Sequence, residues 1–203
     1  MDRSADNTTP DYLDLSLREF LELVASGSPA PGGGSVAAVA VALAAGLAGM
    51  AARLSTGQLA DAAKLADHAD ALRRTVAPLA RADAESYGRV LDALRLPRGS
   101  ETRAERIEDA LSGAADVPLA VAEAGREVAD IAARLVEEGN PNLEGDARTA
   151  VFLADAGVRA AAALAAINLS SANVQDERLG RARELIDQTA EAVRRATEDH
   201  SRG

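Results

Sequence analysis

The sequence predicts an all-α protein, an up-and-down bundle of about six helices, some of them kinked at proline. Apolar residues recur at helical spacing through most of the chain. No segment shows the sustained alternation of apolar and polar residues that is typical of a strand. Hydrophobic residues make up 47% of the chain and aromatic residues only 2%. Because small side chains bury little area each, stability must come from many close helix contacts.

The chain length and the cysteine and histidine content indicate the number of domains and argue against disulfides and a metal site. A chain of 203 residues can form one sizeable core, and we expect a disordered polar tail over residues 1–12 and a single helical domain over 13–203. There is no cysteine, which excludes a disulfide framework and a thiol nucleophile. His68 and His200 are far apart in the sequence, so we expect no metal site.

The charge and hydropathy indicate a cytoplasmic protein. A net charge of −10 argues against nucleic acid as a partner, since its phosphates require a basic surface, and against anionic membranes. The run from Val36 to Ala52 is the one candidate for a membrane span, but it is short and is followed directly by Arg53. No basic segment precedes it, as a signal peptide would require. A buried central helix is the better interpretation.

The first two helices have recognisable ends. Ser16 and Glu19 fit a capping box for a first helix, and Gly27 ends it. A second helix is predicted from Ser35, as its N-cap, to about Ser55. This helix is apolar all round, which places it inside the bundle.

Four further helical stretches follow. Pro78 should kink or split the first of them, and the second should break near Val117-Pro118. The turn at Gly139-Asn140-Pro141-Asn142 precedes the third. The predicted bounds are Asp61 to Leu94, Thr102 to Glu137, Asp146 to Ser171 and Asp176 to Thr197.

The segment that enters the second helix is a candidate binding loop. It runs Ser28-Pro29-Ala30-Pro31-Gly32-Gly33-Gly34-Ser35. A helix start leaves backbone N–H groups without partners and carries a partial positive charge. Without side chains in the way, a carboxylate or a polarised carbonyl can approach those groups. The alternative is a tight turn that lets two helices pack closely.

Three carboxylates lie in unusually apolar or glycine-rich surroundings. Asp83 and Tyr87 are four residues apart and share a helix face. If Asp83 is buried its pKa is raised, and it can give and take protons near neutral pH; the alternative is a surface aspartate beside a kink. Tyr87 is alternatively a core aromatic residue. Asp146 is either a helix cap or a ligand-binding group, and Asp155 most simply pairs with Arg159.

Four segments of the chain resemble a known enzyme family. In chain order they are Ser28 to Ala38; Asp83-Ala84-Glu85-Ser86-Tyr87 with Ala93-Leu94-Arg95-Leu96-Pro97; Val117-Pro118-Leu119; and Gly139-Asn140-Pro141-Asn142 with the nearby Asp146 and Ile167-Asn168-Leu169. Over about Leu15 to Val193 the chain is similar to the formiminotetrahydrofolate cyclodeaminase and methenyltetrahydrofolate cyclohydrolase family.

The resemblance implies an all-α homodimeric enzyme that acts on a one-carbon group carried by tetrahydrofolate. Such enzymes either close formiminotetrahydrofolate to the methenyl form with loss of ammonia, or open the methenyl ring with water. The folate is the substrate, and no cofactor or metal is bound. The family's catalytic acid–base aspartate corresponds to Asp83. The residues expected to bind the substrate are Pro31, Gly32, Gly33, Gly34, Ser35, Tyr87, Asn140, Asn142 and Asp146.

The chain also departs from the family pattern, which leaves a second hypothesis open. Gly145-Asp146 replaces a Ser-Asp pair, Leu164-Ala165-Ala166 replaces Asn-Val-Arg, and Gln58-Leu59-Ala60 stands where lysines are frequent. The transferase domain fused to some cyclodeaminases is absent from this sequence. The first hypothesis is the folate enzyme. The second is a non-catalytic relative that binds a small ring or only self-associates.

Overall fold

A computed structural model describes residues 9–172 and 176–198 of the chain. Within these ranges the protein is all-α, as predicted, with eight α-helices and two short 3-10 helices. The α-helices are α1 Leu17–Val24, α2 Gly33–Arg53, α3 Ala62–Val76, α4 Leu79–Arg95, α5 Arg103–Gly113, α6 Asp116–Glu138, α7 Glu144–Ser171 and α8 Glu177–Thr197. The 3-10 helices are η1 Tyr12–Asp14 and η2 Pro141–Leu143.

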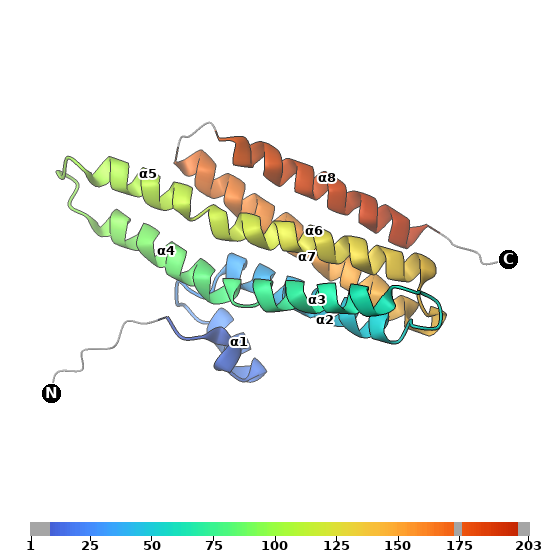
Figure 1. Cartoon of the computed structure of the whole chain (residues 1–203). Coiled ribbons are helices and arrows are strands. Elements are labelled where there is room, and N and C mark those ends of the chain that lie inside the picture. The colour runs from blue at the N-terminus through green and yellow to red at the C-terminus, as the bar shows by residue number, and fades with distance from the viewer. Residues whose placement is uncertain (1–8, 173–175, 199–203) are drawn as a thin grey trace.

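Consecutive helical stretches run up and down the long axis of the molecule (Figure 1). Two pairs, α3 with α4 and α5 with α6, follow one another nearly end to end, while α1 lies to one side. The apolar helix α2 packs against α3, α4, α6 and α7. The second predicted helix is therefore the central one, and both its ends lie where other helices meet.

The first helix begins as its sequence predicts. Ser16 accepts from the backbone N–H of Glu19, and the Glu19 side chain accepts from the Ser16 N–H, which forms the capping box. Tyr12, just before this helix, is buried and packs on Phe20 with ring centroids 5.9 Å apart. The predicted disordered tail lies outside the described residues over positions 1–8.

The predicted N-cap of the second helix is wrong. The N-cap lies three residues earlier, at Gly32, and Gly33 is the first residue of the helix. Ser35 is therefore the third residue of α2, and it is fully buried. Its hydroxyl bonds across to another helix instead of capping its own.

Two predicted helices are each divided in two. Pro78 lies between α3 and α4, as its missing N–H and fixed φ lead one to expect. The second division falls at Ala114 and Ala115, before Pro118. Pro118 is instead the third residue of α6, where its missing N–H would have no intrahelical partner in any case.

Glycines allow the central helices to approach closely. A Cβ on Gly157 of α7 would lie 2.5 Å from Cγ2 of Val41 in α2, and one on Gly125 of α6 would lie 2.6 Å from Cγ2 of Val158. No heavy atom lies within 4 Å of the corresponding position on Gly180, on the exposed side of α8. The core thus depends on the absence of side chains at specific positions.

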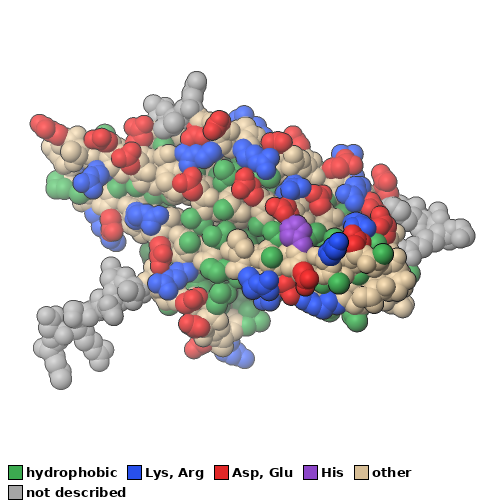
Figure 2. Space-filling model, viewed as in Figure 1, with side chains coloured by type: hydrophobic (Ala, Val, Ile, Leu, Met, Phe, Trp, Pro, Cys, Tyr) green, Lys and Arg blue, Asp and Glu red, His purple; other side chains and the backbone are tan. Residues whose placement is uncertain are grey.

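The segments Gly33–Arg53 and Pro141–Ser171 are long and apolar enough to cross a membrane by length and composition alone. In their most apolar windows, 56% and 44% of the residues are buried inside the bundle. Figure 2 shows acidic and basic side chains interspersed over one face of the molecule.

Gly157→Ala is expected to destabilise the protein by roughly 1–2 kcal/mol, because the new methyl group overpacks the contact between α2 and α7. Gly180→Ala is the matched control. It should stabilise the protein by roughly 0.5–1 kcal/mol, since alanine has the better helix propensity and the site is open. Urea denaturation of both variants measures the difference. Equal stability of the two would contradict the packing described for Gly157.

Candidate active site

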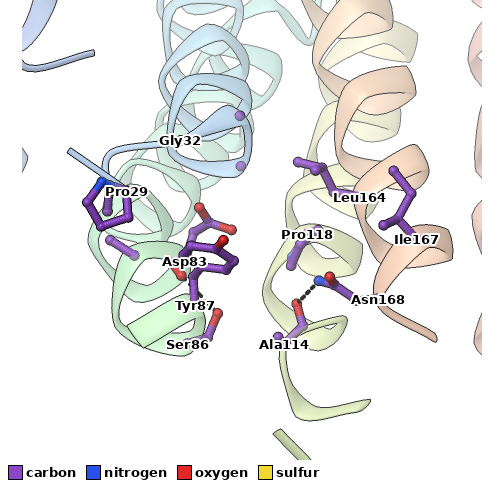
Figure 3. Close-up of a pocket in the computed structure, with 14 residues that line it drawn as sticks. Pro29, Gly32, Asp83, Ser86, Tyr87, Ala114, Pro118, Leu164, Ile167 and Asn168 are labelled. Atoms are coloured by element: carbon purple, nitrogen blue, oxygen red, sulfur yellow. Dashed lines mark hydrogen bonds between the residues drawn. The ribbon is translucent and has the colours of Figure 1, made fainter. Parts of the chain in front are cut away.

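A cavity of about 350 Å³ lies at the N-terminal end of α2. Its walls come from the segment before α2, from α4, from the junction of α5 and α6, and from the last turns of α7. Figure 3 shows Asp83 and Tyr87 on one side of this pocket and Pro118, Leu164 and Asn168 on the other. The lining residues are Pro29, Ala30, Gly32, Gly33, Gly34, Asp83, Ala84, Ser86, Tyr87, Ala114, Pro118, Leu164, Ile167 and Asn168.

Asp83 reaches from α4 to the first turn of α2. Its carboxyl group is bonded by the backbone N–H of Ser35 and lies with Oδ2 3.2 Å from the Ser35 hydroxyl. A Cβ on Gly34 would overlap the carboxyl group, with its Oδ2 only 2.6 Å away. The third glycine of the loop therefore leaves the space that this carboxyl group occupies.

Burial raises the pKa of Asp83 above its ordinary value, while the hydrogen bonds from Ser35 lower it and oppose part of that shift. Asp83 and Tyr87 are the titratable side chains among the residues that line the pocket. A carboxyl group with a raised pKa can donate a proton and take one back near neutral pH. Asp83 is partly buried, and the direction of its pKa shift is the one the sequence predicts.

Tyr87 lies on the same face of α4 as Asp83, as the spacing predicts. Its side chain is 43% exposed, so it is not a core aromatic residue. It lines the pocket at its open side, where a bound ring could stack on it.

The structure places the predicted loop residues in different environments. Gly32, Gly33 and Gly34 line the pocket, whereas Pro31 is buried and does not. Ser35 is fully buried behind Asp83 and does not line the pocket, so its predicted contact with substrate stays a prediction. Among the described residues no glycine has a positive φ, so the loop's glycines serve close approach and not an unusual backbone conformation.

The turn from Asn140 to Asp146 lies at the opposite end of α2. The Asn140 N–H donates to Ser55 Oγ at 2.9 Å, and its Nδ2 donates to the Leu54 carbonyl at 3.0 Å. About 20 residues of helix separate this end from the pocket, which is roughly 30 Å. Within one chain, Asn140, Asn142 and Asp146 therefore do not line the pocket around Asp83.

These contacts give the turn a structural role. Asn140 joins the turn to the C-terminal end of α2, and its side chain accepts from the Asn142 N–H as the cap of η2. Asp146 is the third residue of α7, whose N-cap is Leu143, so the predicted capping role of Asp146 is wrong. The predicted pairing of Asp155 with Arg159 is confirmed, with Nε 2.9 Å from both carboxylate oxygens.

Sequence reasoning named none of the far wall of the pocket as site residues. Asn168 donates from Nδ2 to the Ala114 carbonyl at 2.9 Å, which ties the end of α7 to the break between α5 and α6. Pro118 and Ile167 belong to segments that carry the family resemblance, and that signal could have found them. Leu164 gives this wall an apolar surface beside Gly33, with Cδ1 3.5 Å from the position of a Cβ there.

The fold and the pocket define a helical-bundle protein with a small-molecule site built around one partly buried carboxyl group. The sequence profile of the formiminotransferase-cyclodeaminase family matches residues 16–188. The chain belongs to this family.

Known relatives agree with this assignment. A methenyltetrahydrofolate cyclohydrolase of Methylorubrum extorquens is 35% identical over 87% of this chain and 90% of its own length. A formimidoyltransferase-cyclodeaminase of Mus musculus is 34% identical over 77% of this chain, which spans 31% of that longer protein. The crystal structure of formiminotetrahydrofolate cyclodeaminase from Thermotoga maritima has a TM-score of 0.80 at 28% identity, and the match covers 91% of this chain and 94% of that one.

Gly34→Ala is expected to displace Asp83, because the new methyl group would occupy the position of its carboxyl group. Substrate turnover should fall by about 10-fold or more, because the Asp83 carboxyl group is displaced from its position. The far-ultraviolet circular dichroism spectrum should remain that of a helical protein. Gly46→Ala is the matched control, since Gly46 lies in the same helix, does not line the pocket, and its Cβ would meet only Arg73 Cδ, at 3.8 Å. Full activity in Gly34→Ala would show that turnover does not require the Asp83 carboxyl group to lie against the first turn of α2.

Proposed function

We propose that this protein is a tetrahydrofolate one-carbon enzyme that acts on a C–N bond, and more narrowly a methenyltetrahydrofolate cyclohydrolase. The single observation that carries the proposal is Asp83, a partly buried carboxyl group with a raised pKa at the wall of a cavity of about 350 Å³. The narrower assignment is supported by the Methylorubrum extorquens cyclohydrolase, which matches over nearly its whole length.

The proposed reaction needs one group that takes and returns a proton. The methenyl carbon lies between two nitrogens in an amidinium cation and is already electrophilic. Asp83 as a carboxylate accepts a proton from water as the water oxygen bonds to this carbon. It then returns that proton to one of the two nitrogens as the C–N bond breaks. The hydroxyl proton of the adduct is released to solvent as the formyl group forms on the other nitrogen. Over the whole reaction one water is consumed and one proton is released.

The rest of the pocket holds the substrate in place. Leu164 and Pro118 offer apolar surface for a ring, and Tyr87 an aromatic face at the open side. The Gly33 and Gly34 N–H groups belong to the first turn of α2, where intrahelical acceptors are lacking. These N–H groups can donate hydrogen bonds to a carbonyl oxygen of the substrate. The chemistry requires no metal and no bound cofactor, and we propose that none is used.

Formiminotetrahydrofolate cyclodeaminase activity is the second candidate, favoured by the structural similarity to the Thermotoga maritima enzyme. In that reaction a nitrogen of the folate attacks the carbon of the protonated formimino group, and Asp83 moves the proton from the attacking nitrogen to the resulting amino group, which leaves as ammonia as the methenyl cation forms. The absorbance of methenyltetrahydrofolate separates the two activities. A cyclohydrolase accelerates its loss in buffer, whereas a cyclodeaminase produces it from formiminotetrahydrofolate with release of ammonia. Absence of both activities would favour a non-catalytic relative.

Asp83→Asn is expected to lower turnover by ~10²-fold or more with a much smaller change in substrate affinity, because the amide keeps the shape but transfers no proton. Glu85→Gln is the matched control, since Glu85 lies on the same helix, is exposed and pairs with Arg81 at 2.7 Å. Steady-state kinetics on both variants measure the difference. Turnover of the Asp83 variant at the rate of the unaltered protein would refute the proposed mechanism.

The stability of the Asp83 variant provides a second readout. Since the pKa of Asp83 is raised in the folded protein, its favourable contribution to the free energy of unfolding is present below its unfolded pKa. That contribution is lost as the pH rises through the folded pKa. At pH values above the folded pKa of Asp83, Asp83→Asn should therefore be at least as stable as the unaltered protein. A loss of activity in this variant at such a pH is then not caused by unfolding.

We further propose that the protein is a cytoplasmic homodimer that binds neither membranes nor nucleic acid. The net charge of −10 supports the absence of nucleic acid and of anionic membranes as partners. The homodimer is supported by an apolar stripe on α2 and α7, which pack against each other. Val36, Leu43 and Leu54 are 40%, 59% and 55% exposed, and their spacing puts them on one face of α2. On α7, Phe152 and Ile167 are 47% and 59% exposed. Such a surface is typical of one covered by a second copy.

Leu43→Glu is expected to shift the protein from dimer to monomer at micromolar concentration, because it buries a charge in the proposed interface. Leu94→Glu is the control, since Leu94 is also exposed, at 47%, but lies near the end of α4. Analytical ultracentrifugation gives the oligomeric state. A stable monomer of the unaltered chain would contradict the proposed dimer.

A further inference from the structure

The Ser35 hydroxyl group lies between two oxygen atoms that both accept hydrogen bonds. Its Oγ is 2.7 Å from the carbonyl oxygen of Ala80 and 3.2 Å from Oδ2 of Asp83. Ser35 is fully buried. A serine hydroxyl carries one hydrogen, so it can donate to only one of these oxygens at a time. The shorter distance indicates that the hydrogen goes to Ala80.

The remaining contact needs a hydrogen from Asp83. If Asp83 is ionised, Asp83 Oδ2 and Ser35 Oγ face each other with no hydrogen between them unless the hydroxyl turns away from Ala80. If Asp83 is neutral, its own O–H donates to Ser35 Oγ and both contacts are satisfied together. In both protonation states Ser35 and Asp83 can share one hydrogen bond, but the bond that the hydroxyl donates to the carboxylate is the stronger, because its acceptor is charged. Ser35 therefore lowers the pKa of Asp83 on balance.

We propose that Ser35 is a positioning residue that follows the proton of Asp83 through the reaction. It accepts from neutral Asp83 while donating to Ala80, and it turns to donate to the carboxylate once the proton has gone to the substrate nitrogen. The Ala80 carbonyl can release the hydroxyl because, as a carbonyl inside α4, it keeps its intrahelical bond. The proposal deepens the function proposed above and rests on it.

Few other charges surround Asp83. The pocket residues from α2, α6 and α7 carry none. On α4 itself, Arg81 and Glu85 form an ion pair at 2.7 Å and Tyr87 lines the pocket. From η1 comes Tyr12, whose pKa is raised by burial and by the charges of Asp83 and Glu85. Ser35 is the side chain whose hydrogen bond lowers the pKa of Asp83.

The test is Ser35→Ala, with Ser55→Ala as the matched control. Ser55 is a buried serine at the other end of the same helix, and it also joins a backbone carbonyl, of Ala51 at 2.7 Å, to a second partner. Both variants should lower the melting temperature. Only Ser35→Ala should move the Asp83-controlled limb of the kcat–pH profile, and it should move it upward, because the carboxylate loses a hydrogen-bond donor.

A double variant tests the same coupling. In an Asp83→Asn background, Ser35→Ala should change kcat by less than about 2-fold, whereas alone it should lower kcat by about 10-fold at neutral pH. Equal pH profiles for Ser35→Ala and Ser55→Ala, or independent effects of the two substitutions, would overturn the proposal.

A readout without substrate separates this proposal from the function itself. NMR titration of the Asp83 carboxyl carbon, assigned with Asp83→Asn, should show its midpoint moving upward in Ser35→Ala and staying in place in Ser55→Ala. Lack of folate turnover by the unaltered protein would contradict the proposed function, while an unchanged midpoint in Ser35→Ala would contradict the role of Ser35.

Discussion

The site depends on one contact, the docking of the Asp83 carboxyl group onto the first turn of α2. This contact joins α4 to the central helix, and it exists only because Gly34 has no side chain where the carboxyl group lies. Burial in that place raises the pKa of Asp83, and the Ser35 hydrogen bonds limit the shift. The same few atoms therefore fix the geometry of the pocket and the acidity of its one buried carboxyl group.

The alanine- and glycine-rich composition makes such a contact possible. Helices that carry small side chains approach closely, as α2, α6 and α7 do at Gly125 and Gly157, and the breaks beside Pro78 and Ala115 bring α4, α6 and α7 together at one end of α2. A core of this kind buries little area per residue. That deficit agrees with the apolar stripe left on α2 and α7, which we propose a second subunit covers.

Local sequence signals predicted the helices well and the long-range contacts less well. The capping box at Ser16, the division at Pro78 and the Asp155–Arg159 pair all follow from residues within four positions of one another. The start of α2 was misplaced because Ser35 has the right type for an N-cap, but its hydroxyl is used by α4, 45 residues away. The resemblance implies substrate binding at Asn140, but a motif shows which residues recur and not where the fold puts them, and Asn140 lies at the other end of α2. The far wall at Leu164 and Asn168 needed the tertiary structure for the same reason.

The most direct test of the account is a crystal structure with a non-reactive analogue of methenyltetrahydrofolate. The account predicts the analogue in the pocket at the start of α2, with the atom that replaces the one-carbon unit within about 2.6–3.2 Å of the Asp83 carboxyl group, directly or through one water. An analogue bound at the opposite end of α2, or one whose one-carbon position faces away from Asp83, would contradict it.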